Sequence, residues 1–113
     1  MKTKELSEVK KLPDKVEILG ASYQVEFEDK VMSVEEEPNW IHGRIDTRQR
    51  VIYLSQTDEE DRPLPEDVIE NNFYHELIHC ILTEGMYCQS SADEPLVEWI
   101  GKNLQHLIKT KQL

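Results

Sequence analysis

The stretch from Glu66 to Glu84 reads as one long helix, and it constrains the fold more than any other part of the chain. Pro63 and Pro65 precede it, and Gly85 is placed to end it as the first residue past the cap. Apolar side chains run most of the way round this helix: Ile69, Phe73, Tyr74, Leu77, Ile78, Cys80, Ile81 and Leu82. A helix with so wide an apolar surface is a central, buried one.

The remaining arc of the helix is mainly polar and contains both histidines and the glutamate of the pentapeptide H-E-x-x-H, which runs from His75 to His79. At 3.6 residues per turn, the two histidines lie about 40° apart on one face, one turn apart. Two imidazoles placed in this way can hold one metal ion, and Glu76 lies on the flank of the same stripe. Zinc suits this set, because it takes nitrogen and carboxylate ligands and keeps a position open for water. The motif therefore predicts a zinc site with Glu76 as the catalytic general base. The alternative interpretation is a pair of core histidines on a packed helix.

A third protein ligand is expected, because two histidines alone make a weak site. A second helix is predicted from Asp93 to about Lys109, with Pro95 at its favoured first position, and both Glu94 and Glu98 are candidates. If this helix returns antiparallel after a short connection, Glu98 comes about 6 Å back toward the metal while Glu94 stays near the loop. We therefore favour Glu98 as the third ligand, with Glu94 as the runner-up. The apolar residues of the helix cluster away from Glu98, which would also suit a solvated carboxylate, and Glu94 could be a helix cap. Whichever carboxylate does not bind zinc could orient a ligand histidine.

These motifs resemble the gluzincin metallopeptidases, in which a glutamate follows H-E-x-x-H at a spacing like the one here. The segments NNFYHELIHCILTEG and DEPLVEWIGKNL, with the preceding GRIDTRQRVIYLSQ, are similar to the compact bacterial and phage peptidases around the ImmA/IrrE group. The resemblance implies that His75, His79 and a downstream glutamate bind Zn²⁺ and that Glu76 is the catalytic base. Gluzincins often carry Asp four residues after the ligand glutamate. Lys102 occupies that place after Glu98, whereas Glu98 itself follows Glu94. The third ligand therefore stays open.

Strand signals precede the central helix. Residues 15–28 alternate on either side of Gly20-Ala21-Ser22 and predict a hairpin, and Trp40–Asp46 and Val51–Ser55 predict two more strands. With 113 residues, the chain suits one domain. We expect a flexible segment over residues 1–14 and a single zincin-like metallopeptidase domain over residues 15–113. The expected fold class is α+β, with a small antiparallel sheet followed by the metal-binding helix and a C-terminal helix.

Composition excludes several classes of partner. A net charge of −10 argues against nucleic acid, which needs clustered Lys and Arg. No apolar run approaches a membrane span, and the first residues lack a signal-peptide core, so we expect a cytoplasmic protein with no membrane partner. Cys80 and Cys88 lack a C-x-x-C spacing, and Cys80 sits on the apolar part of the helix. A buried reduced thiol is therefore expected there, not a metal ligand or a disulfide.

The leading functional hypothesis is a zinc-dependent peptidase that hydrolyses a peptide bond in a specific protein or peptide partner, such as a phage or prophage regulator. A substrate could add to an exposed sheet edge through main-chain hydrogen bonds. Four residues are candidate donors to the developing oxyanion, and the sequence does not choose among them: His42, Tyr74, Tyr87 and His106. The alternatives are a zinc-stabilised binding module without hydrolytic activity, and a zinc hydrolase that acts on another kind of bond.

Overall fold

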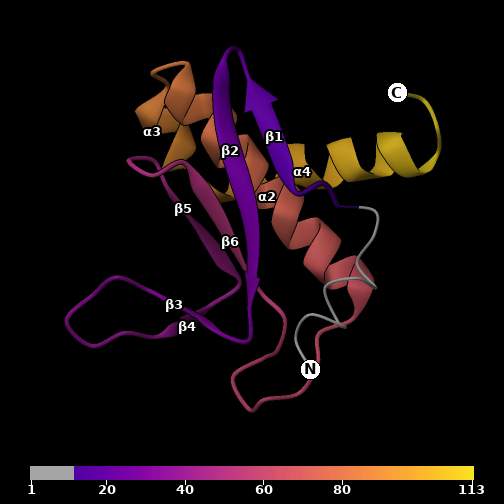
Figure 1. Cartoon of the computed structure of the whole chain (residues 1–113). Helices are drawn as coiled ribbons and strands as arrows, with labels where there is room; N and C mark the ends of the chain where they lie inside the picture. The colour runs from indigo at the N-terminus through magenta and orange to yellow at the C-terminus, as the bar shows by residue number, and fades with distance from the viewer. Residues whose placement is uncertain (1–11) are drawn as a thin grey trace.

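The computed structural model describes residues 12–113, and within them it shows the expected α+β fold (Figure 1). Its strands are β1 (Lys15–Ile18), β2 (Ala21–Glu28), β3 (Val31–Met32), β4 (Trp40–Ile41), β5 (Gly43–Asp46) and β6 (Val51–Ser55). Its helices are α2 (Glu66–Glu84), α3 (Cys88–Ser91) and α4 (Glu94–Lys109). Most of the segment predicted to be flexible, residues 1–14, lies outside the described residues. Leu12, near its end, is buried in the core.

The main sheet has four strands in the order β1-β2-β6-β5. Its outer pairs are antiparallel, as predicted, but the central pair β2–β6 is parallel. The prediction of a wholly antiparallel sheet was therefore wrong. A parallel pair needs a crossover of a dozen or more residues. The stretch between Glu28 and Val51 provides it, because it leaves the sheet as β3 and β4 before it returns as β5.

The turn after β1 and the interruption at His42 explain where the strands of this region end. The predicted hairpin is confirmed, and Leu19 and Gly20 form its turn with φ of 48° and 92°, the left-handed pair that a tight two-residue hairpin favours. The strand predicted over Trp40–Asp46 is interrupted at His42. Before that residue the chain pairs with β3, and after it the chain pairs with β6. His42 therefore lies where the chain passes from the small two-stranded sheet to the main one.

Helix α2 covers one face of the main sheet, and α4 crosses α2 on its other side (Figure 1). The core lies between the sheet and α2 and is built from these buried side chains: Ala21, Tyr23, Val25, Ile52, Leu54, Ile69, Phe73 and Cys80. Buried residues alternate with exposed ones along β2, and Ile52 and Leu54 of β6 are both fully buried. These side chains lie on the face of the sheet that packs against α2. The predicted central helix is thus the element around which both other layers pack.

The bounds of α2 and α4 in the sequence agree with the prediction. The chain leaves α2 differently from expectation, because Gly85 has an ordinary φ of −84° and the left-handed residue is Met86, with φ of 68°. The short helix α3 between them was not predicted. Among residues 12–113, no helix is long and apolar enough to cross a membrane.

Candidate metal centre

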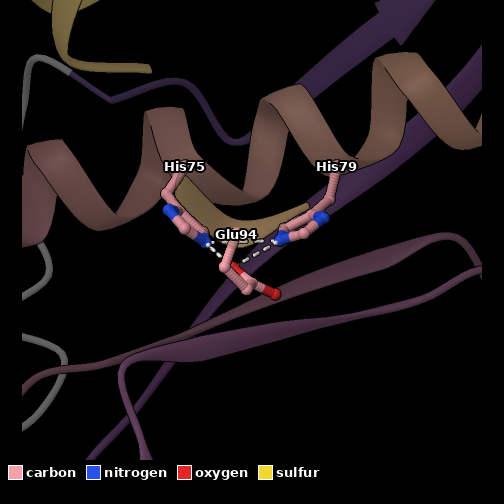
Figure 2. A group of neighbouring side chains, drawn as sticks. All are labelled: His75, His79 and Glu94. Atoms are coloured by element: carbon pink, nitrogen blue, oxygen red, sulfur yellow. Dashed lines mark hydrogen bonds and ion pairs between the residues drawn. The ribbon is translucent and has the colours of Figure 1, made fainter. Parts of the chain in front are cut away.

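The imidazoles of His75 and His79 and the carboxylate of Glu94 converge on one point beside α2 (Figure 2). His75 Nε2 lies 3.2 Å from His79 Nε2 and 2.9 Å from Glu94 Oε1, and His79 Nε2 lies 3.4 Å from the same oxygen. Ligand atoms of a tetrahedral zinc ion, bonded at about 2.0–2.2 Å, are separated by about 3.3 Å. The three donor atoms therefore already lie at the spacing of one face of a zinc tetrahedron. The side chain of Glu94 is 64 % exposed, so this triangle is open to solvent on one side.

Glu98 contacts the opposite nitrogen of His75. Its Oε1 lies 2.7 Å from His75 Nδ1, and its Oε2 accepts a hydrogen bond from Asn71 Nδ2 at 3.3 Å. Burial would raise the pKa of Glu98, but the hydrogen bonds from His75 and Asn71 outweigh it and hold that pKa below its usual value. An ionised Glu98 can only accept, so Nδ1–H of His75 donates to it and Nε2 of the same ring is turned toward Glu94 and His79.

His79 is oriented by a residue that the sequence did not indicate. Ser91 Oγ, at the end of α3, lies 3.0 Å from His79 Nδ1. Burial lowers the pKa of His79 and thereby favours its neutral form. When Nδ1 carries the proton and donates a hydrogen bond to Ser91 Oγ, the lone pair of Nε2 is free to bind a metal. Ser91 carried no sequence signal, because its placement depends on the unpredicted α3.

The structure brings Glu94, the runner-up, to the two histidines, and it places Glu98 behind His75. Glu98 was favoured on the expectation that the second helix begins near the C-terminal end of α2. In fact α3 folds back along α2, so that Ser91 has already returned to the level of His79 before α4 starts. The first turn of α4 therefore lies beside the histidines. In the gluzincin pattern that the sequence resembles, an acidic residue follows the ligand glutamate by four positions. Glu98 follows Glu94 at that spacing, whereas Lys102 follows Glu98.

A glycine sets the close approach of α4 to this site. A Cβ atom on Gly101 would lie 3.3 Å from His75 N and 3.4 Å from its Cα, tighter than ordinary side-chain contacts. Gly101 is buried, and it lies two turns after Glu94 on α4. Its missing side chain lets α4 cross α2 at His75 itself, which holds Glu94 and Glu98 within reach of the two nitrogens of that ring.

Glu76 belongs to α2, and its side chain lies against the start of β5. Its residue is only 7 % exposed, and burial raises the pKa of its carboxyl to about 7, with Glu94 adding to the rise and His75 opposing it. A Cβ on Gly43 would lie 3.4 Å from Glu76 Cγ and 2.5 Å from the carbonyl oxygen of Tyr53. Glycine at this place allows β5 to approach the Tyr53 carbonyl of its partner strand so closely.

A cleft of about 470 Å³ opens between α2 and the edge strand β5. It is lined by Ile41, His42, Gly43, Arg44, Ile45, His75, Glu76, His79, Ser91 and Glu94. All three converging donors and Glu76 thus face one cavity whose opposite wall is a sheet edge. Of the four candidate oxyanion donors, all within the described residues, His42 lines the cleft and Tyr74, Tyr87 and His106 do not.

The two cysteines lie in different environments, and Cys80 is buried as expected. Cys80 is fully buried in the core, and burial raises the pKa of its thiol to about 12. Cys88 is exposed on α3. Neither belongs to the group of converging donors found within residues 12–113.

Comparison of the chain with protein-family models, with curated proteins and with solved structures found no match.

Proposed function

We propose that this protein is a zinc-dependent peptidase in which His75, His79 and Glu94 bind the metal and Glu76 is the general base. The single observation that carries the proposal is the triangle of donor atoms, with sides of 2.9–3.4 Å, next to a buried glutamate in an open cleft. Core histidines on a packed helix would need neither a third donor nor a cavity. The resemblance of the sequence to the gluzincins points to the same activity.

The donor set itself favours zinc. Two neutral imidazoles and one carboxylate form a common ligand set of catalytic zinc, which leaves a further position for water or substrate. Glu98 and Ser91 support the set, because each contacts the outer nitrogen of one imidazole. The ionised carboxylate of Glu98 can only accept a hydrogen bond, so it favours the tautomer of His75 that leaves Nε2 for the metal, and the Ser91 hydroxyl can accept in the same way from His79. In this proposal Glu98 is the residue that positions His75, and the ligand role passes to Glu94.

Bound zinc would polarise the scissile carbonyl and activate a water for attack. Glu76 would accept a proton from the attacking water and deliver it to the leaving amine, which is the role of a general base that becomes a general acid. His42 lines the same cleft from the opposite wall, where an N–H of its ring could donate to the developing oxyanion. Proton transfer and oxyanion stabilisation would thus come from α2 and from the chain beside β5.

Strand β5 supports a peptide as the substrate. It is the last strand of its sheet, and its residues Gly43 to Ile45 line the cleft. An extended peptide could pair with this edge by main-chain hydrogen bonds and so lie across the donor atoms. This mode of binding holds a backbone in register with the metal, whatever the side chains are.

The test is Glu76→Gln in a cleavage assay. Zinc-loaded wild type is screened against a mixed peptide library, and the fastest substrate is then compared in both proteins. We expect the variant to keep its zinc and its thermal midpoint and to lose about 10²–10⁴-fold in hydrolysis, because a carboxamide cannot accept the proton. Equal cleavage by the variant would disprove the mechanism.

A second candidate function rests on the fact that the donors come from two helices. An ion held by α2 and by Glu94 of α4 would cross-link the elements on either side of α3, which is what a zinc-stabilised binding module requires. Such a module has no use for a buried carboxylate between its ligands. Zinc-dependent stability without cleavage of any library peptide would favour this function over the peptidase.

A further inference from the structure

The turn that joins α2 to α3 has a methionine in the place where a glycine is usual. The backbone N–H of Tyr87 donates to the carbonyl of Leu82 at 2.7 Å. The N–H of Met86 donates to the carbonyl of Thr83 at 3.0 Å. These are the two hydrogen bonds of a Schellman motif, whose left-handed residue is here Met86, with φ of 68°. Gly85 directly precedes it and has an ordinary φ of −84°. A methionine therefore takes the conformation that its glycine neighbour could adopt freely.

A helix that ended one residue earlier would use the glycine instead. Gly85 would then be the left-handed residue, and the relief of Met86 would be worth about five- to thirtyfold in an equilibrium. The motif also brings the residue after the left-handed position into apolar contact with the helix one turn back. In the earlier ending that contact pairs Met86 with Ile81, which are 83 % and 43 % exposed in the observed turn. The backbone preference and the exposed apolar pair both favour the earlier ending.

The observed ending is held by contacts that the following segment makes at the metal centre. Ser91 Oγ lies 3.0 Å from His79 Nδ1, at the end of α3. Glu94 Oε1 lies 2.9 Å from His75 Nε2, at the start of α4. An earlier ending would turn the chain after the helix by about 100° around the helix axis and so break both contacts. A strained backbone persists only where its surroundings fix it, and these contacts do so for Met86.

Residues 86–96, which we call the lever, connect the turn to the firmly packed part of α4. None of them is buried, whereas Val97, which follows, is fully buried. The lever carries Ser91 and Glu94, and both residues line the cleft. Glu98 lies beyond Val97, on the anchored part of the helix. Movement of the lever would therefore take Ser91 and Glu94 away from the site and leave Glu98 in place.

We propose that the α2–α3 turn is a switch with two positions and that zinc at the metal centre selects the observed one. In that position Met86 is left-handed and the lever brings Ser91 and Glu94 to the histidines. In the other position Gly85 is left-handed, α2 ends one residue earlier, and the lever withdraws and opens the cleft on its side. Selection by zinc rests on the proposed function. The second position of the turn rests only on the residues of the turn and the lever.

The first test measures zinc affinity, by competition with a chromophoric chelator, in full-length proteins that differ at Met86. Met86→Gly removes the cost of the observed position. We expect it to bind zinc at least about fivefold more tightly, because apparent affinity follows the fraction of protein already in the binding position. Met86→Val places a β-branched side chain in the left-handed region, and it should bind zinc about threefold or more weakly than the wild type.

Leu19→Gly is the matched control. Leu19 is also left-handed, with φ of 48°, but it lies in the turn between β1 and β2 and does not line the cleft. Its replacement relieves the same kind of backbone cost outside the switch. We expect this variant to gain stability in urea denaturation and to keep the zinc affinity of the wild type. A Met86→Gly variant that gains stability in the same way without any gain in zinc affinity would overturn the switch.

The second test observes the turn itself by NMR of the wild type. A left-handed residue gives a strong nuclear Overhauser effect between its own amide and α protons. We expect Met86 to give this signal with zinc and to lose it after chelation. The same signal from Met86 with and without zinc would overturn the switch and leave the zinc site standing.

The remaining outcomes separate the switch from the proposed function. Absence of zinc binding by the folded wild type would overturn the metal centre and, with it, selection by zinc. A zinc-dependent Met86 signal together with the graded affinities, but without cleavage of any library peptide, would support the switch and count against the peptidase. Cleavage by a wild type whose Met86 series binds zinc equally would support the peptidase and overturn the switch.

Discussion

The two halves of the candidate site belong to regions of the molecule that are held in place in different ways. His75, Glu76 and His79 lie on α2, whose other faces pack against fully buried residues such as Tyr23, Ile52 and Leu54. Ser91, Glu94 and Glu98 lie on the C-terminal segment, in which α3 has no buried residue and α4 has only Val97 and Gly101. One half is therefore fixed by the core, and the other is fixed by fewer buried residues together with the polar contacts of the site.

This difference indicates which of the two regions a bound metal ion would stabilise more. Apolar burial already determines the positions of the two histidines, so an ion would change them little. Glu94 reaches the same point from α4, which packs on α2 around the buried residues Val97 and Gly101. Binding free energy from an ion shared by the two regions would therefore appear mainly as ordering of the C-terminal segment.

The largest effect should separate the two regions by their packing. Leu54→Ala removes a fully buried side chain opposite α2, and we expect it to cost about 2–5 kcal/mol of unfolding free energy. Leu96 on α4 is 36 % exposed, so its side chain already contacts water. Leu96→Ala should therefore cost well under about 2 kcal/mol of unfolding free energy. Urea denaturation of both variants without metal makes the comparison. Equal losses would mean that the two regions are equally well packed.

Zinc should protect the second region far more than the first. At a concentration about a hundredfold above its dissociation constant, a ligand stabilises the folded state by about 2.7 kcal/mol. We expect hydrogen exchange to slow markedly in peptides that span residues 85–98 and to change little in the β1–β2 hairpin. Mass spectrometry with and without zinc measures both segments in one sample. Protection confined to the hairpin, or none in either segment, would contradict the comparison.

The smallest effect should distinguish the two glutamates of α4. Glu94→Ala removes a proposed ligand, whereas Glu98→Ala removes a residue that holds His75, a change that costs about 10–100-fold in metal affinity. We expect the loss with Glu94→Ala to exceed that with Glu98→Ala by at least about tenfold, or about 1.4 kcal/mol. Competition with a chelator ranks the two variants. The reverse ranking would return the ligand role to Glu98.

The first region was also the more predictable one from the sequence. The bounds of α2, its burial and the convergence of His75 with His79 follow from helical periodicity, which is a local property. The hairpin of β1 and β2 followed from alternation around a glycine turn. The parallel pairing of β2 with β6 could not be predicted in this way, because it depends on the path of a long connection.

The second region was predicted less well for a related reason. The helix α4 was expected, but its position relative to α2 depends on the short helix α3 and on the close contact at Gly101. Periodicity within α4 says nothing about either. As a result, the sequence identified Glu94 and Glu98 as the two candidates but favoured Glu98 as the ligand, whereas the structure brings Glu94 to the two histidines. It also gave no indication of Ser91, whose function depends only on where the chain returns.

The most direct test of the zinc site is a zinc titration of the purified protein against a chromophoric chelator, with His75→Ala and His79→Ala beside the wild type. The three converging donors predict one tight equivalent for the wild type and none for either variant, while all three proteins keep their helical circular dichroism. Full retention of zinc by both histidine variants, or no zinc binding by the folded wild type, would contradict the proposed metal centre.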